Sequence, residues 1–244
     1  MVNRRRLLIA VAATAAIAAA GMPPSGRAAE RGPVVVELFT SQGCSSCPGA
    51  DRFLAELAGR GDVVALSFHV DYWNYMGWAD PFSRPDYSTR QRHYKKAMGL
   101  RYVYTPQMVV DGRSEAIGTE RATVERLIRE AAEKPNLPIA LAVDGMTVTV
   151  DLPGGIGPHD ATVWLAVFDR LHRTEVGRGE NSGKALVNAH VVRALTAIGE
   201  WNGSAARLTY TTDAMTHDRG CAVIVQSKGQ GPILGSAMVR PPMS

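Results

Sequence analysis

Two cysteines separated by two residues are the clearest chemical signal in this chain. Cys44 and Cys47 (CSSC) follow an apolar run, residues 34–39, and precede a helical pattern that begins near Pro48. Unpaired backbone N–H groups and the positive end of the helix dipole favour the thiolate of a cysteine at a helix N-terminus. The spacing therefore predicts a redox dithiol in which Cys44 attacks a substrate disulfide and Cys47 resolves the mixed disulfide.

Metal binding and structural stapling are the two alternatives for this pair. With His69 or His93, the cysteines offer a thiolate–imidazole set for Cu(I) or Zn(II), as in copper chaperones. The chain has no second CxxC and no closely spaced histidine pair to complete a zinc site. A disulfide across so short a loop contributes little through chain entropy, so stapling is a poor reason for this spacing. We assign no metal and no cofactor.

Glu37 is an acidic residue within an otherwise apolar run, seven positions before Cys44. A buried carboxylate near thiols is harder to ionise and can act as a general base. The alternative is a glutamate at a strand edge that faces solvent or pairs with a basic residue. The sequence leaves both interpretations open.

Thr105 and Pro106 precede a second informative strand, which ends at an Asp-Gly hairpin turn at residues 111–112. A cis Thr105–Pro106 bond would open a backbone edge beside Cys44 to an extended peptide and would keep metal from bridging the dithiol. A trans bond, the commoner state, would make Pro106 an ordinary strand start. The order of the elements favours cis.

The elements that must position these residues alternate between strand and helix. The expected order is a strand over 34–39, a helix over 48–59, a strand over 63–70, a helix over 87–98, a loop entering a strand over 100–111, a strand over 114–117, and a helix capped by Thr119. The first three form a right-handed βαβ unit. Prolines at 135 and 138 mark the expected domain boundary.

Short strands and turns dominate the chain beyond that boundary. Residues 139–152 predict a hairpin about Asp144-Gly145, and residues 161–169 predict a further strand. Residues 185–199 fit a helix or a long strand. We interpret residues 137–240 as an antiparallel β-rich module.

Residues 33–134 resemble the thioredoxin-fold oxidoreductases. Two features carry the resemblance: CSSC at a strand-to-helix junction, and Tyr104-Thr105-Pro106 at the entrance to a strand. The resemblance implies a thioredoxin-like α/β domain followed by the β-rich module. It also implies that Cys44 and Cys47 are catalytic and that Glu37, Thr105 and Pro106 support them.

A rim around the dithiol is expected from its neighbours in the chain. Ser45 and Ser46 offer hydroxyl groups to a thiolate but no charge, so they do not rank the protein as an oxidant or a reductant. Residues 69–82 (HVDYWNYMGWADPF) contain five aromatic side chains and follow a strand that should end beside the dithiol. His69, Asp71 and Trp73 would then belong to a rim that faces a peptide or ligand. The alternative is that these aromatics cover the junction with the second module.

Two further features of the second half have modest interpretations. Residues 177–183 (GRGENSG) lack the Lys-Ser/Thr ending of a phosphate loop and predict a turn-rich connection. Cys221 begins an apolar run and is expected to be a small buried hydrophobe.

The N-terminus has the pattern of an export signal. An arginine-rich start (residues 4–6), an apolar alanine-rich run (7–20) and a small-x-small site (26–28) predict a signal peptide over residues 1–28. No run is long enough for a good transmembrane helix, so we expect no stable membrane span after processing. The predicted location is the periplasm or the cell exterior.

Net charge gives no support for nucleic-acid binding. The chain has 27 Lys and Arg against 23 Asp and Glu, a formal charge of +4. Four basic residues, and no acidic residue, lie in the predicted leader: Arg4, Arg5, Arg6 and Arg27. The exported part is therefore balanced. We expect partners that carry disulfides or thiols, together with a redox partner. The sequence predicts no oligomeric state.

Longer strings resemble the exported bacterial family called domain of unknown function 1223. They are ELFTSQGCSSCP, HVDYWNYMGWADPF, YTPQMVVDG, GRGEN and GPILG, spread over essentially the whole exported chain. The resemblance implies a thioredoxin-like domain with an appended β-rich part, in proteins usually described as secreted or as thiol–disulfide isomerase-like. We expect an exported thiol–disulfide oxidoreductase or isomerase-like protein that acts on protein or small-molecule disulfides. The alternative is a copper-handling chaperone or a non-catalytic thioredoxin-like binding protein.

Overall fold

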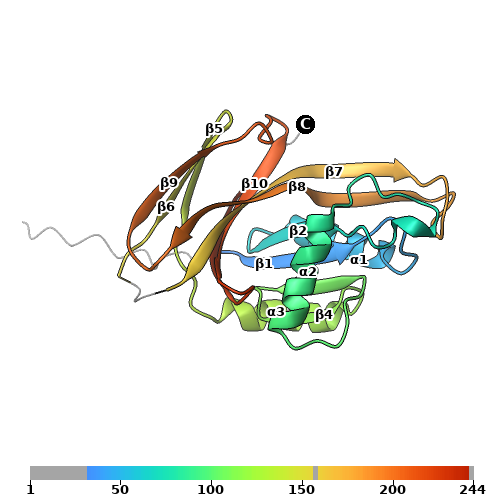
Figure 1. Cartoon of the computed structure of the whole chain (residues 1–244), viewed down its shortest axis with the longest axis horizontal. Helices are drawn as coiled ribbons and strands as arrows, with labels where there is room; N and C mark the ends of the chain where they lie inside the picture. Colours follow the sequence, from blue (N-terminus) through green and yellow to red (C-terminus); the bar gives the residue numbers. More distant parts are fainter. Residues whose placement is uncertain (1–31, 156–158, 242–244) are drawn as a thin grey trace, which may run out of the picture.

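The computed structural model describes residues 32–155 and 159–241 as a mixed α/β structure (Figure 1). The predicted signal peptide, residues 1–28, lies outside the described residues. The strands are β1 (Val34–Thr40), β2 (Val63–His69), β3 (Gln107–Val110), β4 (Ser114–Ile117), β5 (Ala140–Asp144), β6 (Thr147–Leu152), β7 (Ala161–Glu175), β8 (Ala185–Trp201), β9 (Ala206–Thr211), β10 (Arg219–Ser227) and β11 (Ile233–Val239). The helices are α1 (Pro48–Ala58), α2 (Pro85–Ala97) and α3 (Arg121–Ala132), with a 3-10 turn η1 (Asn74–Met76). None of the helices in this part of the chain is long and apolar enough to cross a membrane.

A large sheet forms the centre of the molecule, with strand order β11-β10-β7-β8-β2-β1-β3-β4. β1 and β2 are parallel, as predicted for a strand–helix–strand unit, and β3 pairs antiparallel with both β1 and β4. Every residue of β1 and β2 is buried. Their nearly continuous apolar sequences match strands that are covered on both faces.

The C-terminal strands continue this central sheet. β8 lies beside β2, with Ser67 paired to Val191, and β7, β10 and β11 follow in antiparallel pairings. The antiparallel β-rich character predicted for residues 137–240 is therefore present, and residues 185–199 are part of a strand. The two segments share one sheet, while their division into domains stays a prediction.

The two faces of the central sheet carry different layers. Residues such as Val36 of β1 pack in the core beneath α1 and α3, whereas residues such as Val35 pack in the core that contains the buried side of α2. Side chains alternate along a strand. Thr40 therefore faces the α1 side and Glu37 the α2 side, which decides what each residue can contact.

A second sheet, of order β5-β6-β9, packs over part of the first. Val148 and Val150 of β6 share a core with Val163 of β7 and with Cys221 and Val223 of β10. Figure 1 shows this sheet at one end of the molecule, away from the helices. Cys221 is buried in this core, as predicted.

Two predicted helix starts differ from the structure. α2 begins at Pro85, two residues before the predicted start at Tyr87. α3 begins at Arg121 with Glu120 at the N-cap position, one residue after the predicted cap Thr119, and no side chain caps it.

Candidate functional site

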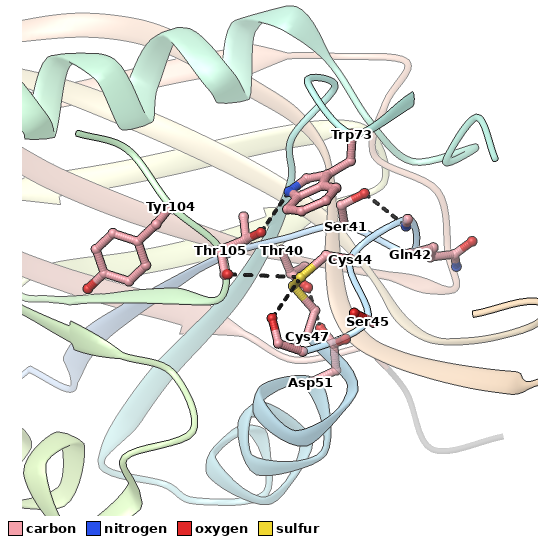
Figure 2. The surroundings of a disulfide bond; sticks show 12 residues. Thr40, Ser41, Gln42, Cys44, Ser45, Cys47, Asp51, Trp73, Tyr104 and Thr105 are labelled. Atoms are coloured by element: carbon pink, nitrogen blue, oxygen red, sulfur yellow. Dashed lines mark hydrogen bonds between the residues drawn. A yellow bond between two sulfur atoms is a disulfide. The ribbon is translucent and has the colours of Figure 1, made fainter. Parts of the chain in front are cut away.

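Cys44 and Cys47 form a disulfide at the junction between β1 and α1, with their Cα atoms 5.5 Å apart (Figure 2). Cys47 is the N-cap of α1, and its carbonyl oxygen accepts hydrogen bonds from the N–H groups of Ala50 (2.9 Å) and Asp51 (3.0 Å). Pro48 occupies the first turn, where a missing N–H costs nothing. The pair thus lies at the positive end of a helix, as the sequence predicted.

The loop before β3 faces this disulfide. The Thr105–Pro106 bond is cis, as predicted. The Cys44 Sγ atom lies 3.9 Å from the Thr105 carbonyl oxygen and 3.2 Å from the Ser46 hydroxyl. The structure therefore brings Cys44, Thr105 and Pro106 together, although they are about sixty positions apart in the chain.

Trp73 lies over the disulfide. Its indole N–H donates to the Thr105 hydroxyl at 2.8 Å, and Figure 2 shows the ring beside Cys44. Cys44 is only 1% exposed, while Ser45 and Ser46 are exposed. Of the predicted rim residues, Trp73 and the two serines therefore surround the disulfide.

The loop between β7 and β8, residues 176–184, holds the CxxC segment from the other side. The buried Asn181 side chain donates to the carbonyl oxygens of Gln42 (3.0 Å) and Cys44 (2.9 Å). A carboxylate oxygen of Glu180 accepts from the Ser45 N–H at 3.1 Å. The sequence predicted a turn-rich connection here but missed these contacts. The GRGEN string was the one signal pointing to them.

The same loop also packs on the aromatic insert. A Cβ atom placed on Gly179 would lie 3.2 Å from the Met76 carbonyl oxygen and 3.2 Å from the Trp78 Cβ, so the close approach needs glycine. Trp78 in turn donates its indole N–H to the Gln42 side chain at 3.2 Å. The insert therefore contacts the C-terminal segment, as the alternative interpretation predicted, whereas a rim that faces a peptide or ligand stays a prediction.

Glu37 is not brought to the disulfide. It is fully buried on the α2 side of the sheet, where Arg90 donates to its two carboxylate oxygens at 2.5 and 2.9 Å. Tyr94 donates its hydroxyl to Glu37 at 2.5 Å, and the Gln226 amide of β10 donates to that hydroxyl at 2.9 Å. Glu37 thus joins β1, α2 and β10 in an ion-pair network instead of serving the thiols.

The remaining predicted residues are separated from one another. His69 is buried on the α1 side, with its Nδ1 atom 2.7 Å from the carboxylate of Asp80. Asp71 accepts a hydrogen bond from Ser88 of α2 at 2.5 Å, and His93 lies exposed on α2. Across residues 32–155 and 159–241, no group of three or more His, Cys, Asp or Glu side chains is arranged to hold a metal ion.

Asp51 is the acidic residue that lies behind the disulfide, and the sequence analysis missed it. It follows Cys47 by one helical turn, is only 4% exposed, and accepts a hydrogen bond from the Thr40 hydroxyl at 2.9 Å (Figure 2). Burial raises the pKa of Asp51 to about 7, although the nearby His69 and the Thr40 hydroxyl act in the opposite direction. The available signal was an acidic residue among the apolar residues of α1 that face the core.

Comparison with known proteins places the chain among proteins without an established activity. The family model described as a protein of unknown function (DUF1223) matches residues 35–226. A crystal structure of an Agrobacterium tumefaciens protein is 33% identical, covers 88% of this chain and 97% of its own, and superimposes with a TM-score of 0.76. HBP35 of Porphyromonas gingivalis, at 13% identity, covers 88% of this chain and 78% of its own with a TM-score of 0.61, a likeness of fold alone. A search of curated proteins gives no match.

Proposed function

We propose that this chain, which belongs to the DUF1223 family, is an exported thiol–disulfide oxidoreductase or isomerase-like protein that acts through Cys44 and Cys47. One observation carries the proposal. The disulfide lies at the N-terminus of α1, and the carbonyl of Thr105, just before cis-Pro106, lies 3.9 Å from the Cys44 sulfur. A sulfur at a helix N-terminus is suited to exchange, because the unpaired N–H groups and the helix dipole favour its thiolate.

The order of elements supports a thioredoxin-like assignment for residues 33–134. β1, α1 and β2 are followed by α2, the antiparallel pair β3–β4 and α3, and the strands lie in the order β2-β1-β3-β4. α1 and α3 pack on one face and α2 on the other. The dithiol and the cis-proline loop then meet at one end of the sheet, the place where that fold carries its redox pair.

The proposed reaction is a two-step exchange. In the reduced protein, the Cys44 thiolate attacks one sulfur of a substrate disulfide, forming a Cys44–substrate bond and releasing the other substrate sulfur as a thiolate. Cys47 then loses its proton and attacks the Cys44 sulfur. The internal disulfide re-forms, and the second substrate sulfur leaves as a thiolate, so two electrons have passed to the substrate. The same steps in reverse oxidise a dithiol.

Asp51 is placed to accept the Cys47 proton. The carboxyl lies one turn further along α1, on the buried side, and its pKa of about 7 lets it take up or release a proton at neutral pH. Glu37, on the other face, is occupied by Arg90. In our proposal the general-base role therefore belongs to Asp51.

Access to the sulfur requires a local movement. Cys44 is almost fully buried, and Trp73 bridges from the insert to Thr105 above it. We infer that a partner protein or small disulfide first displaces the Trp73 indole, because this ring lies beside the nearly buried Cys44 sulfur. Tyr75, 82% exposed on η1, offers an apolar contact for such a partner.

Export is part of the proposal. The basic, apolar and small-residue pattern of residues 1–28 is that of a signal peptide, and disulfides persist outside the cytosol. The proposed partners are disulfide- or thiol-bearing proteins and a redox partner that resets the Cys44–Cys47 pair.

Cysteine variants test the proposal. We expect the parent to reduce insulin or refold scrambled ribonuclease and to equilibrate with glutathione buffers. Cys44→Ser should lose exchange altogether, whereas Cys47→Ser should accumulate a mixed disulfide through Cys44, visible by mass spectrometry. Cys221→Ser is the matched control and should keep full activity, because Cys221 lies in a separate core.

Two results would contradict the proposal. One is a parent whose Cys44–Cys47 pair does not equilibrate with glutathione at all. The other is stoichiometric Cu(I) retention by the reduced protein with no exchange activity, which would identify a copper-handling chaperone instead.

A further inference from the structure

A buried polar cluster lies between the disulfide and the central sheet. Asp51 contributes from α1, Thr40 from β1, Ser67 and His69 from β2, and Asn188 from β8, and each of these residues is at most 4% exposed. Thr40 and His69 are directly paired across β1 and β2, so their side chains leave the sheet side by side on the α1 face. Burying polar groups in a core costs folding free energy unless the groups are hydrogen-bonded.

Asp80 fixes the orientation of His69. Its carboxylate lies 2.7 Å from the Nδ1 atom of His69 and also accepts from the N–H groups of Gln42 (2.7 Å) and Phe82 (2.9 Å). Burial opposes ionisation of Asp80, but His69 and these N–H groups outweigh it and keep its pKa below the ordinary value. An ionised carboxylate only accepts hydrogen bonds, so His69 donates through Nδ1.

The other ring nitrogen of His69 makes no hydrogen bond to any residue that the structure describes. His69 Nε2, Ser67 Oγ and Asn188 Nδ2 are buried and have no hydrogen-bond partner among the residues the structure describes. A neutral imidazole with Nδ1–H directed at a carboxylate presents Nε2 as an acceptor, and the Asp80 charge stabilises the imidazolium that forms.

The charged and titratable neighbours of His69 are few. Asp51 belongs to α1 and Asp80 to the insert, while Thr40 and Asn188 from the flanking strands are neutral. Phe82 packs on the His69 ring at 5.4 Å between centroids and separates it from His172. His69 is the basic member of this group.

We propose that His69, held by Asp80 and paired with Thr40 across β1 and β2, favours the carboxylate form of Asp51, which is the form that accepts the proton of Cys47. The inference rests on the proposed function and adds a positioning residue that acts through Asp51. When Cys47 attacks the Cys44–substrate disulfide, its proton moves to Asp51, the Cys44–Cys47 bond forms, and the substrate leaves as a thiolate. The imidazolium of His69, paired with Asp80, acts on this step only through its charge. The electrons move only between sulfur atoms.

The test is a two-phase release experiment. Reduced protein is mixed with the chromogenic disulfide dithiodipyridine, whose first thiopyridone is released by Cys44 and whose second is released when Cys47 resolves the mixed disulfide. Rates are measured between about pH 5 and pH 9, the range in which an imidazole and a raised carboxyl titrate. We expect His69→Gln to keep the first phase. The pH midpoint of the second-phase rate should rise by about one unit, because the variant lacks the His69 imidazolium, whose positive charge favours the ionised form of Asp51.

Two further variants make the result decisive. Asp80→Asn leaves His69 in place without its carboxylate and should also move the second-phase midpoint upward, which covers the case in which His69→Gln fails to fold. His172→Gln is the matched control, because His172 also contacts a carboxylate, that of Asp169 at 2.6 Å, but lies beyond Phe82. It should leave both phases unchanged.

The outcomes separate this inference from the proposed function. A parent with no first phase would overturn the redox function itself. A normal first phase, together with a second-phase midpoint that is the same in the parent, His69→Gln and Asp80→Asn, would overturn the role of His69 alone.

Discussion

Two buried carboxylates lie on opposite faces of the same sheet, and their surroundings differ completely. Glu37 on the α2 side is matched by the Arg90 guanidinium, which donates to both of its oxygens, and by the Tyr94 hydroxyl. Asp51 on the α1 side accepts a hydrogen bond from the Thr40 hydroxyl, and no Arg or Lys side chain that the structure describes forms an ion pair with it. Both are almost fully buried.

The difference separates a structural acid from a reactive one. Glu37 joins distant elements, because the Arg90 and Tyr94 groups that bind it also contact Gln226 of β10. Asp51 has no such set of donors, and burial raises its pKa to about 7, so it gains or loses a proton at neutral pH. Four substitutions, two on each face, test this contrast.

The largest effect is expected for Glu37→Ala. It leaves the Arg90 charge buried without its partner, and breaking a buried pair in this way costs about 3–5 kcal/mol of unfolding free energy. Urea denaturation of the oxidised protein measures the loss. The control is the double variant Glu37→Leu with Arg90→Met, which removes both charges and should recover most of the stability. A loss below about 1 kcal/mol in Glu37→Ala would show that the network is not structural.

Asp51→Asn should change the pH dependence of stability. The pKa of Asp51 is about 7 in the folded protein and ordinary when unfolded, so its stabilising protonation is complete below about pH 4 and is lost as the pH rises through 7. One pKa unit corresponds to about 1.4 kcal/mol, so the parent loses at most about 4 kcal/mol over this range through Asp51.

The variant should be free of that loss. We expect Asp51→Asn and the parent to unfold with similar free energies near pH 4, and the variant to become progressively more stable than the parent up to about pH 7. Urea titrations at several pH values check this. A difference that does not vary with pH would mean that Asp51 titrates normally and that the two carboxylates are alike.

Tyr94→Phe removes the one hydroxyl that donates to Glu37. The expected loss is about 2 kcal/mol, in the range for a hydrogen bond to a charged group, and it should be equal at pH 5 and pH 8 because Arg90 keeps its charge throughout. Thiol exchange by Cys44 should be unaffected, since Glu37 lies on the far face of the sheet. A change in the exchange rate at equal folded fraction would connect the two faces and weaken the comparison.

Local sequence signals were enough for most of the N-terminal elements. Apolar runs bounded by glycine and polar residues predicted β1 and β2, and Pro48 marked the start of α1. These signals work because helix starts and buried strands are determined by neighbours in the chain. The cis Thr105–Pro106 bond was predicted instead from the order of the elements around it.

Contacts between distant segments could not be predicted in this way. Residues 185–199 fitted either a helix or a strand, and only pairing with β7 and β2 makes them a strand. Asn181 reaches the Cys44 carbonyl from 137 positions away, a contact for which no spacing rule exists. The joining of the C-terminal strands to the central sheet is of the same kind.

The choice between Glu37 and Asp51 shows the limit most clearly. Alternation along β1 puts Glu37 and Thr40 on opposite faces, but the sequence does not say which face α1 covers. The structure answers this, because Thr40 contacts Asp51 and Glu37 contacts α2. The sequence therefore identifies a buried acid near the dithiol only when it is known which face of the sheet α1 covers.

The smallest effect is expected for Thr40→Val, which is the counterpart of Tyr94→Phe on the other face. It removes the hydroxyl that donates to Asp51 at 2.9 Å, while keeping the side-chain shape. The hydroxyl favours the ionised carboxyl, so its loss should raise the pKa of Asp51 further. We expect about 1 kcal/mol of lost stability at pH 8 and less at pH 5, where Asp51 is protonated in the parent.

The kinetic readout of the same variant sharpens the contrast. Resolution of a mixed disulfide by Cys47 should need a higher pH in Thr40→Val, with a midpoint raised by less than about one unit, because 1.4 kcal/mol corresponds to one pKa unit. Tyr94→Phe, measured alongside, should keep the parent midpoint. If the two hydroxyl deletions gave the same pH profile, the distinction between the ion-paired Glu37 and the titrating Asp51 would fail, and with it the reason for assigning proton transfer to the α1 face.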